Sequence, residues 1–331
     1  MTRTIAIASL VIVSITAPAQ VPSPPPDVAS AVTRIDKYPT GQVTFPNGVR
    51  GVPDVAYATS VGYRPLKLDL YLPPASMPQP ANGFPLVVQI HGGDWMSGDK
   101  RLNGAFVDFP AVLASLSARG YVVAAINYRL SGEAHFPAQM QDVDSALRWL
   151  RLSATQYGID PRRTVTWGES AGAQLATLAA VNCHADAGGA CVQGAVAWFG
   201  VFDMSTLAEQ AKAVKALSRE DENAPEWQLL GCEAKECGKE QLAAASPAMF
   251  VNQTDPPMLL IAGSDDMTVP VKQTLEMAGK LQTAGVKHDV LLLQGLDHNF
   301  IGKTPEATRD ANLKALDATF KFIDQTIGPA K

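Results

Sequence analysis

Short apolar segments alternate with amphipathic segments along most of this chain. The apolar or β-branched segments, which we expect to be strands, are residues 52–61, 66–72, 84–90, 121–128, 163–167, 194–201, 257–262 and 289–293. The segments with helical character are residues 106–119, 138–157, 171–180, 271–284 and 306–327. This alternation predicts an α/β fold with a mostly parallel central sheet of about eight strands and helices on both faces. The first two strands are expected to form an antiparallel pair.

The segment 138–157 reads as a single amphipathic helix. Its expected core face consists of apolar residues at helical spacing, namely Met140, Val143, Ala146, Leu147, Leu150 and Leu152. Such a face predicts that this helix packs against the sheet.

Residues 203–245 interrupt the alternation of expected strands and helices. They contain the charged run Arg219-Glu220-Asp221-Glu222, two cysteines and Trp227. We interpret this stretch as an insertion between two strands, either a partial lid that shapes the substrate pocket or a solvated structural loop. The chain shows no internal repeat and no boundary for a second domain.

The first residues have the pattern of an export signal. Arg3 precedes an apolar run over residues 5–16, and Ala17-Pro18-Ala19 has the A-x-A form of a cleavage site. Because the run is too short to span a bilayer comfortably, a signal peptide over residues 1–19 is favoured over an uncleaved anchor. A spacer over residues 20–45 and one folded domain over residues 46–331 follow. The protein is therefore expected to be periplasmic or secreted, without membrane association after cleavage.

All four cysteines lie in the part of the chain that is expected to be exported. They are Cys183, Cys191, Cys232 and Cys237. An even number in an oxidising compartment predicts two disulfides. The local pairings Cys183–Cys191 and Cys232–Cys237 are favoured, because each brackets a short loop. A metal site is the weaker alternative, because the spacings do not suit zinc and only His184 is nearby.

Composition changes this picture little. The chain has 331 residues, of which 47% are hydrophobic and 18% charged, as is usual for a globular protein. Its net charge of -5 and its lack of a basic cluster argue against a nucleic-acid partner. The sequence leaves the oligomeric state open.

The candidate chemistry begins at Gly168-Glu169-Ser170-Ala171-Gly172, which has the G-x-S-x-G pattern of a nucleophile elbow. The pattern lies between the expected strand 163–167 and the expected helix 171–180, which is the context it requires. Glycine at both ends removes side chains that would collide at the sharp turn. The turn places the Ser170 hydroxyl at a helix N-terminus, where negative charge is favoured. A surface turn that happens to contain serine is the alternative, and the flanking segments disfavour it.

A serine nucleophile needs a base, and in this type of fold the acid and the histidine follow the serine in that order. Only His288 and His298 lie downstream on the sheet side, and His298 follows the last strand, where catalytic groups of open α/β sheets gather. His298 is therefore the expected base. Asp266 is the expected orienting acid, and Asp265 is the second candidate.

A glycine-rich turn, His91-Gly92-Gly93-Asp94-Trp95, follows the strand 84–90. It is similar to the HGGG-type motif, so the backbone N–H groups of Gly93, Asp94 and Ala171 are expected to form an oxyanion hole. His91 is expected to be a structural hydrogen-bonding residue. The expected pocket residues are Trp95, Phe136, Glu169 and Trp227, and the depth of the pocket is expected to depend on residues 104–107 and 203–245.

These motifs occur together in a known superfamily. They comprise residues 91–95, 97–100, 127–130, 136–142, 149–151, 157–161 and 266–270, with the elbow and His298. In this combination, from about residue 55 to 325, the chain resembles the α/β-hydrolases, within them the hormone-sensitive-lipase-like esterases, and more closely the bacterial BD-FAE esterases. The resemblance implies the α/β-hydrolase fold, the triad Ser170, Asp266 and His298, and ester hydrolysis without a cofactor. Asp94 departs from the motif, where a third glycine is usual, and its side chain is expected either to orient a residue or a water molecule or to disfavour anionic substrates.

The sequence thus predicts a serine carboxylesterase that forms an acyl-enzyme on Ser170. Export and the resemblance favour a short-acyl ester or an acetyl or feruloyl ester of the plant cell wall, either small or linked to a polysaccharide. An amidase, peptidase or aryl formamidase with the same triad is the first alternative. A non-catalytic binding protein with the hydrolase fold is the second, and the presence of all three triad residues disfavours it.

Overall fold

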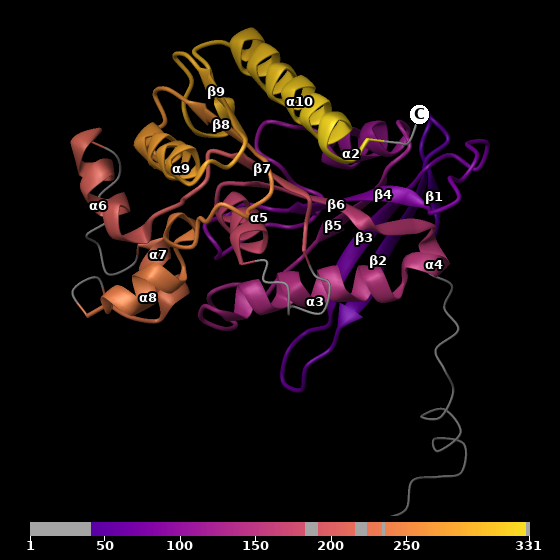
Figure 1. Cartoon of the computed structure of the whole chain (residues 1–331), viewed down its shortest axis with the longest axis horizontal. Helices are drawn as coiled ribbons and strands as arrows, with labels where there is room; N and C mark the ends of the chain where they lie inside the picture. The colour runs from indigo at the N-terminus through magenta and orange to yellow at the C-terminus, as the bar shows by residue number, and fades with distance from the viewer. Residues whose placement is uncertain (1–40, 183–190, 216–223, 234–235, 329–331) are drawn as a thin grey trace, which may run out of the picture. The chain divides into compact units, whose positions relative to one another are not determined.

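The computed structural model describes residues 41–182, 191–215, 224–233 and 236–328. Within these ranges the chain builds a nine-stranded sheet in the order β1-β2-β3-β5-β4-β6-β7-β8-β9 (Figure 1). The strands are β1 (Val43–Thr44), β2 (Arg50–Ala58), β3 (Leu66–Leu72), β4 (Phe84–Ile90), β5 (Val122–Ile126), β6 (Ile159–Glu169), β7 (Gly194–Trp198), β8 (Met258–Gly263) and β9 (His288–Leu293). The pairings among β1, β2, β3 and β5 are antiparallel, and those from β5 through β4 to β9 are parallel. The predicted α/β architecture is confirmed.

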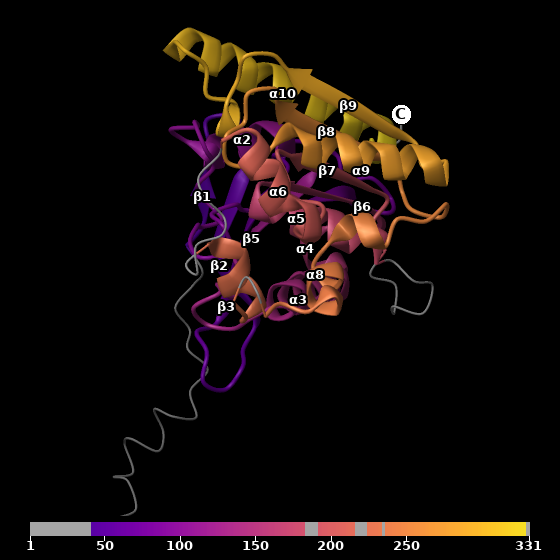
Figure 2. The same cartoon turned by 90° about the vertical axis from the view of Figure 1, so that its left-hand side faces the viewer.

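Helices cover both faces of the sheet. They are α2 (Phe109–Ser117), α3 (Ala138–Leu152), α4 (Ala154–Tyr157), α5 (Ala171–Val181), α6 (Met204–Ala213), α7 (Pro225–Leu230), α8 (Lys239–Ala244), α9 (Val271–Ala284) and α10 (Pro305–Ile327). Figures 1 and 2 show α3 and α5 on one side of the sheet and α2 and α10 on the other. Each side has its own buried apolar cluster, because both faces of the central strands are apolar.

The helix boundaries differ from the sequence-based expectation in two places. The helix expected from residue 106 starts at Phe109, because the Asp108 side chain accepts a hydrogen bond from the Ala111 N–H and so caps it. The helix expected over residues 138–157 is split at Ser153 into α3 and α4. Leu152 was wrongly assigned to the core face and is 84% exposed. An α-helix turns by about 200° over two residues, so Leu152 points away from the side that buries Leu150.

The N-terminal boundary also differs. Strand β1 pairs with β2, so the sheet begins at Val43, inside the predicted spacer. The predicted signal peptide and residues 20–40 of the spacer lie outside the described residues. Within the described ranges, no helix combines the length and apolar character needed to cross a bilayer.

The insertion over residues 203–245 carries α6, α7 and α8 and is fixed to the body by buried hydrogen bonds. Gln174 Nε2 on α5 donates to the Ala245 carbonyl at 2.7 Å, and the Phe136 N–H donates to the Leu229 carbonyl at 2.7 Å. The predicted disulfide Cys232–Cys237 lies between α7 and α8. The other predicted pair includes Cys183, which lies outside the described residues.

Candidate active site

The functional candidates come together at one edge of the sheet. Ser170 directly follows β6, the turn over residues 91–95 follows β4, Asp266 follows β8, and His298 follows β9. These strands are parallel, so their carboxyl ends meet at the same edge. Segments up to about two hundred residues apart in sequence are thereby placed around one point.

The backbone at Ser170 is held in a strained conformation. Its φ of 52° and ψ of -120° are sparsely populated by residues other than glycine. The turn is tight enough that a Cβ on Gly168 would lie 2.2 Å from the Gly172 carbonyl oxygen, and a Cβ on Gly172 would lie 2.0 Å from the Ile90 carbonyl oxygen. Both glycines are therefore required sterically, as predicted from the sequence.

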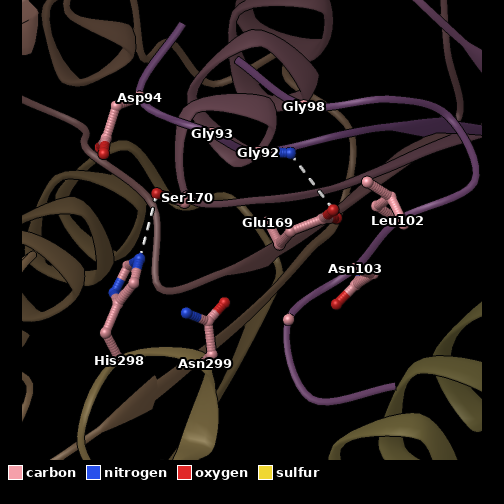
Figure 3. A pocket seen from close by; sticks show the side chains of 11 residues that line it. Gly92, Gly93, Asp94, Gly98, Leu102, Asn103, Glu169, Ser170, His298 and Asn299 are labelled. Carbon is pink, nitrogen blue, oxygen red and sulfur yellow. Dashed lines mark hydrogen bonds between the residues drawn. The ribbon is translucent and has the colours of Figure 1, made fainter. Parts of the chain in front are cut away.

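Ser170, His298 and Asp266 form a chain of hydrogen bonds. His298 Nε2 lies 3.2 Å from Ser170 Oγ (Figure 3). On the other side of the ring, His298 Nδ1 lies 2.9 Å from Asp266 Oδ2. The Asp266 carboxylate is fixed in turn, because Oδ1 accepts hydrogen bonds at 2.8 Å from the N–H groups of Thr268 and Val269. This geometry suits removal of a proton from the serine hydroxyl.

The structure also separates the two candidate acids. Asp266 is 2% exposed and contacts the imidazole, whereas Asp265 is exposed and accepts a hydrogen bond from Ser264 Oγ at 2.6 Å. The acid that orients His298 is therefore Asp266 in this geometry.

The turn after β4 and the start of α5 supply the backbone N–H groups expected to form the oxyanion hole. The N–H of Gly92 donates to Glu169 Oε1 at 3.2 Å, so Gly92 is occupied. Within the described part of the chain, the N–H groups of Gly93, Asp94 and Ala171 donate no hydrogen bond. Gly93 and Asp94 both have positive φ, 107° and 54°, which turns this loop sharply beside the serine. These three N–H groups are free to bind a developing oxyanion.

Two buried titratable side chains, Glu169 and His91, lie next to the oxyanion loop. Burial raises the pKa of Glu169 to about 8, even though its carboxyl accepts hydrogen bonds from Gly92 and Gln89. Burial lowers the pKa of His91 to about 4, so its ring stays neutral near pH 7. The His91 ring stacks on Tyr128 with centroids 4.4 Å apart, which agrees with the structural role expected for this histidine.

A pocket of about 250 Å³ lies beside Ser170. Its lining residues are Gly92, Gly93, Asp94, Gly98, Leu102, Asn103, Gly104, Glu169, Ser170, His298 and Asn299. Of the four predicted pocket residues, Glu169 alone is among them. Three lining residues were not predicted from the sequence, namely Leu102, Asn103 and Asn299. The sequence indicated them only through their position in loops next to the motifs. Across the described ranges, the pocket included, no three or more His, Cys, Asp or Glu side chains are grouped to hold a metal ion.

The other three pocket predictions were wrong for packing reasons. Trp95 is 1% exposed and turns inward, where its Nε1 donates to Gln174 Oε1 at 3.0 Å. Trp227 on α7 is 7% exposed and belongs to the core that lies under the insertion. Phe136 packs against that same core. No described residue of the insertion 203–245 lines the pocket, so the predicted shaping of the pocket by this segment is not seen in the described part.

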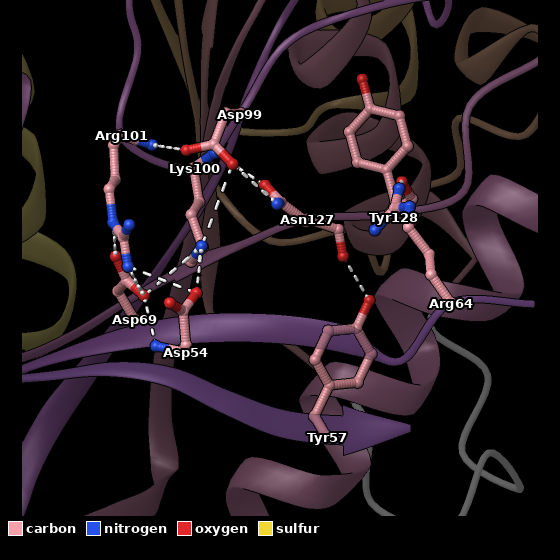
Figure 4. Close-up of polar contacts among 9 residues, drawn as sticks. All are labelled: Asp54, Tyr57, Arg64, Asp69, Asp99, Lys100, Arg101, Asn127 and Tyr128. Carbon is pink, nitrogen blue, oxygen red and sulfur yellow. Dashed lines mark hydrogen bonds and ion pairs between the residues drawn. The ribbon is translucent and has the colours of Figure 1, made fainter. Parts of the chain in front are cut away.

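A cluster of ion pairs holds the residues that follow the oxyanion loop in sequence. Its members are Asp54, Asp69, Asp99, Lys100 and Arg101 (Figure 4). Lys100 Nζ lies 2.9 Å from Asp54 Oδ1 and 3.5 Å from Asp69 Oδ1, and the Lys100 side chain is 3% exposed. Gly98, two residues earlier, packs closely on the loop, since a Cβ there would lie 2.4 Å from the Gly92 carbonyl oxygen. The cluster thus anchors the segment that supports the oxyanion loop.

The sequence is similar to a known family and to known esterases. Residues 68–281 match the model of the BD-FAE family. Esterase LipQ of Mycobacterium tuberculosis is 28% identical over 214 residues, which cover 62% of this chain and 48% of LipQ. The chain spans about half the length of the curated relatives it matches.

Solved structures extend the similarity to most of the chain. A truncated carbohydrate esterase from gut microbiota superposes with a TM-score of 0.67 at 25% identity, covering 84% of this chain and 96% of the other. A thermophilic esterase from the planctomycete Thermogutta terrifontis has a TM-score of 0.65 at 25% identity, with coverage of 84% and 93%. These similarities confirm the predicted α/β-hydrolase fold.

Proposed function

The chain belongs to the BD-FAE family of α/β-hydrolases, and on this premise we propose that it is a serine carboxylesterase. The observation that carries the proposal is the hydrogen-bonded chain from Asp266 through His298 to Ser170, next to three free backbone N–H groups. A nucleophile, a base with its orienting acid, and an oxyanion site are the parts that acyl transfer requires.

The proposed reaction proceeds through an acyl-enzyme. His298 Nε2 takes the proton of Ser170 Oγ as the oxygen attacks the ester carbonyl, while Asp266 stabilises the imidazolium. The carbonyl oxygen becomes negative and accepts hydrogen bonds from the N–H groups of Gly93, Asp94 and Ala171. His298 then donates its proton to the alkoxide oxygen as the bond to the alcohol breaks. Water attacks the acyl group by the same route and regenerates Ser170.

We further propose that the substrates are either short-acyl esters or acetyl or feruloyl esters of the plant cell wall. A pocket of about 250 Å³ supports a small group on at least one side of the ester. The similarity to an enzyme described as a carbohydrate esterase supports an ester of a carbohydrate. The export pattern of residues 1–19 supports a periplasmic or secreted enzyme that meets such substrates outside the cytoplasm.

Hydrolysis of p-nitrophenyl esters tests the function. The purified protein and its Ser170→Ala variant are compared on a series from acetate to palmitate. We expect hydrolysis that is strongest on the short acyl chains and is lost in the variant. A folded wild-type protein that hydrolyses none of these esters would contradict the proposed activity.

A further inference from the structure

Apart from its glycines, the pocket beside Ser170 is lined mostly by side chains that are able to form hydrogen bonds. Among its described lining residues, only Leu102 has an apolar side chain, and Leu102 is 66% exposed at the rim. Figure 3 shows Asn103 and Asn299, from two loops far apart in sequence, on the wall away from Asp94. A site for an alkyl group is typically lined by aliphatic or aromatic side chains. The wall that carries the two asparagines therefore favours a polar group.

Asn103 has unused hydrogen-bonding capacity. Its side chain is 5% exposed, and its Nδ2 has no hydrogen-bond partner in the described part of the chain. In Figure 3 this side chain reaches into the pocket with its oxygen foremost. Buried amides without a partner are rare in native proteins, and rotation about the terminal bond would turn the amino group to the pocket. A hydroxyl group can donate to the oxygen or accept from the nitrogen, so it suits either orientation.

Asn299 lies on the adjoining wall. A Cβ on Gly104, the residue after Asn103, would lie 2.9 Å from Asn299 Oδ1, so a side chain there would crowd this amide. The Asn299 backbone is fixed, because its carbonyl accepts a hydrogen bond from Asn312 Nδ2 on α10 at 3.3 Å. Its φ of 59° is one that asparagine tolerates better than most residues. The two loops thus hold two side-chain amides against one small space.

From this arrangement we infer that Asn103 and Asn299 form a subsite for a hydroxyl group of the leaving alcohol. The leaving oxygen has to lie within reach of His298 Nε2, which gives it a proton. Asn299 directly follows His298, so an alcohol that continues from this oxygen runs along the wall formed by the two amides. The inference rests on the proposed esterase function and narrows its substrates to esters of diols or polyols.

Isosteric pairs of esters test this subsite. In the first pair, 2-hydroxyethyl acetate and n-propyl acetate differ on the alcohol side by a hydroxyl in place of a methyl group. In the second pair, ethyl glycolate and ethyl propionate differ in the same way on the acyl side. The readout is the ratio of kcat/KM within each pair, which is insensitive to the amount of active protein. One hydrogen bond of this kind is expected to favour 2-hydroxyethyl acetate by about three- to tenfold.

Two variants remove the amides in different ways. Asn103→Leu keeps the volume, and Asn299→Gly keeps the positive φ. Both are expected to remove the preference in the first pair, whatever they do to the absolute rates. Leu102→Ala is the matched control, because it alters the same pocket without removing a hydrogen-bonding group, and it should leave the ratio unchanged.

The outcomes separate this inference from the proposed function. A preference for 2-hydroxyethyl acetate that both amide variants abolish supports the subsite. An active enzyme with no preference in the first pair, or with a preference that the variants keep, overturns it. A preference confined to the ethyl glycolate pair also overturns it, because the pocket then receives the acyl group. A folded protein inactive on all four esters and on p-nitrophenyl acetate overturns the esterase function, and the subsite with it.

Discussion

The Glu169 carboxyl accepts a hydrogen bond from the Gly92 N–H at 3.2 Å, one residue before the first N–H group of the proposed oxyanion hole. Burial raises the pKa of this carboxyl to about 8, so it is mostly protonated at pH 7. When it ionises, a buried negative charge forms close to the position where the substrate oxygen becomes negative. Like charges in a buried site repel strongly, so ionisation of Glu169 opposes the transition state.

We therefore expect Glu169→Gln to change the alkaline side of the pH profile. In the wild type, kcat/KM should fall as the pH rises through about 8, because Glu169 loses its proton. Glutamine has the same shape and cannot ionise, so the variant should keep its activity to higher pH. Initial rates on p-nitrophenyl acetate, corrected for spontaneous hydrolysis, measure both profiles. An alkaline limb that is the same in both proteins would show that Glu169 does not control it.

The same ionisation should affect stability. The pKa of Glu169 is raised in the folded state, so its contribution to stability is complete below the unfolded value of 4.5 and is lost as the pH rises through about 8. At 1.36 kcal/mol per pKa unit, the loss has an upper limit of roughly 5 kcal/mol. Urea unfolding of the wild type and Glu169→Gln at acidic and alkaline pH measures it. We expect the wild type to lose more free energy of unfolding than the variant over this range; equal losses would contradict the raised pKa.

Replacement of the two neighbouring acids should separate their roles. Asp266→Asn removes the charge that holds the His298 tautomer, and kcat should fall about a thousandfold or more. Asp265→Asn is the matched control, because Asp265 is exposed and contacts Ser264 rather than His298. Its kcat should stay close to the wild-type value. The unfolding midpoints of both variants show whether either change acts through stability, and a reversed order of effects would exclude Asp266 as the orienting acid.

The sequence predicted those parts of the molecule whose position follows from local pattern. The bounds of β4 and α9 agree with expectation, because an apolar run or a helical period ends there at turn-forming residues. Ser170, Asp266 and His298 come together because each follows a strand of a parallel sheet. A residue that follows such a strand in the sequence therefore lies at the carboxyl edge of the sheet.

The pocket walls depend on packing between distant segments, and local pattern carries little of this information. Trp95 was expected in the pocket because it follows the oxyanion turn, but its φ of 57° turns the ring toward Gln174. Asn103 and Asn299 line the same pocket although almost two hundred residues separate them. Whether the two side chains come together depends on how the loop after β4 packs against the loop after β9. In the sequence, only the glycine at position 104 indicates that these loops come close to each other.

The ion-pair cluster should contribute to stability through Lys100. Lys100→Met keeps much of the packing but leaves the buried Asp69 carboxylate with fewer cations, and the loss is expected to be about 3 kcal/mol. Lys321→Met is the matched control, because the Lys321–Asp317 pair is exposed on α10 and should contribute less than about 0.5 kcal/mol. Urea unfolding at neutral pH measures both. A loss for Lys100→Met no larger than that of the control would show that the cluster does not hold the loop.

Asp94 places a carboxylate at the position where the related motif has glycine, and Figure 3 shows this side chain beside Ser170. An anionic substrate should be repelled there, whereas a neutral ester of similar size should not. Asp94→Asn keeps the backbone N–H that the oxyanion hole needs and removes only the charge. We expect the variant to raise kcat/KM for monomethyl succinate about five- to tenfold more than kcat/KM for dimethyl succinate. Added salt should weaken the discrimination of the wild type and leave that of the variant nearly constant, because screening acts only on the charge. If the variant discriminates against the anion as strongly as the wild type, the selectivity arises elsewhere in the pocket.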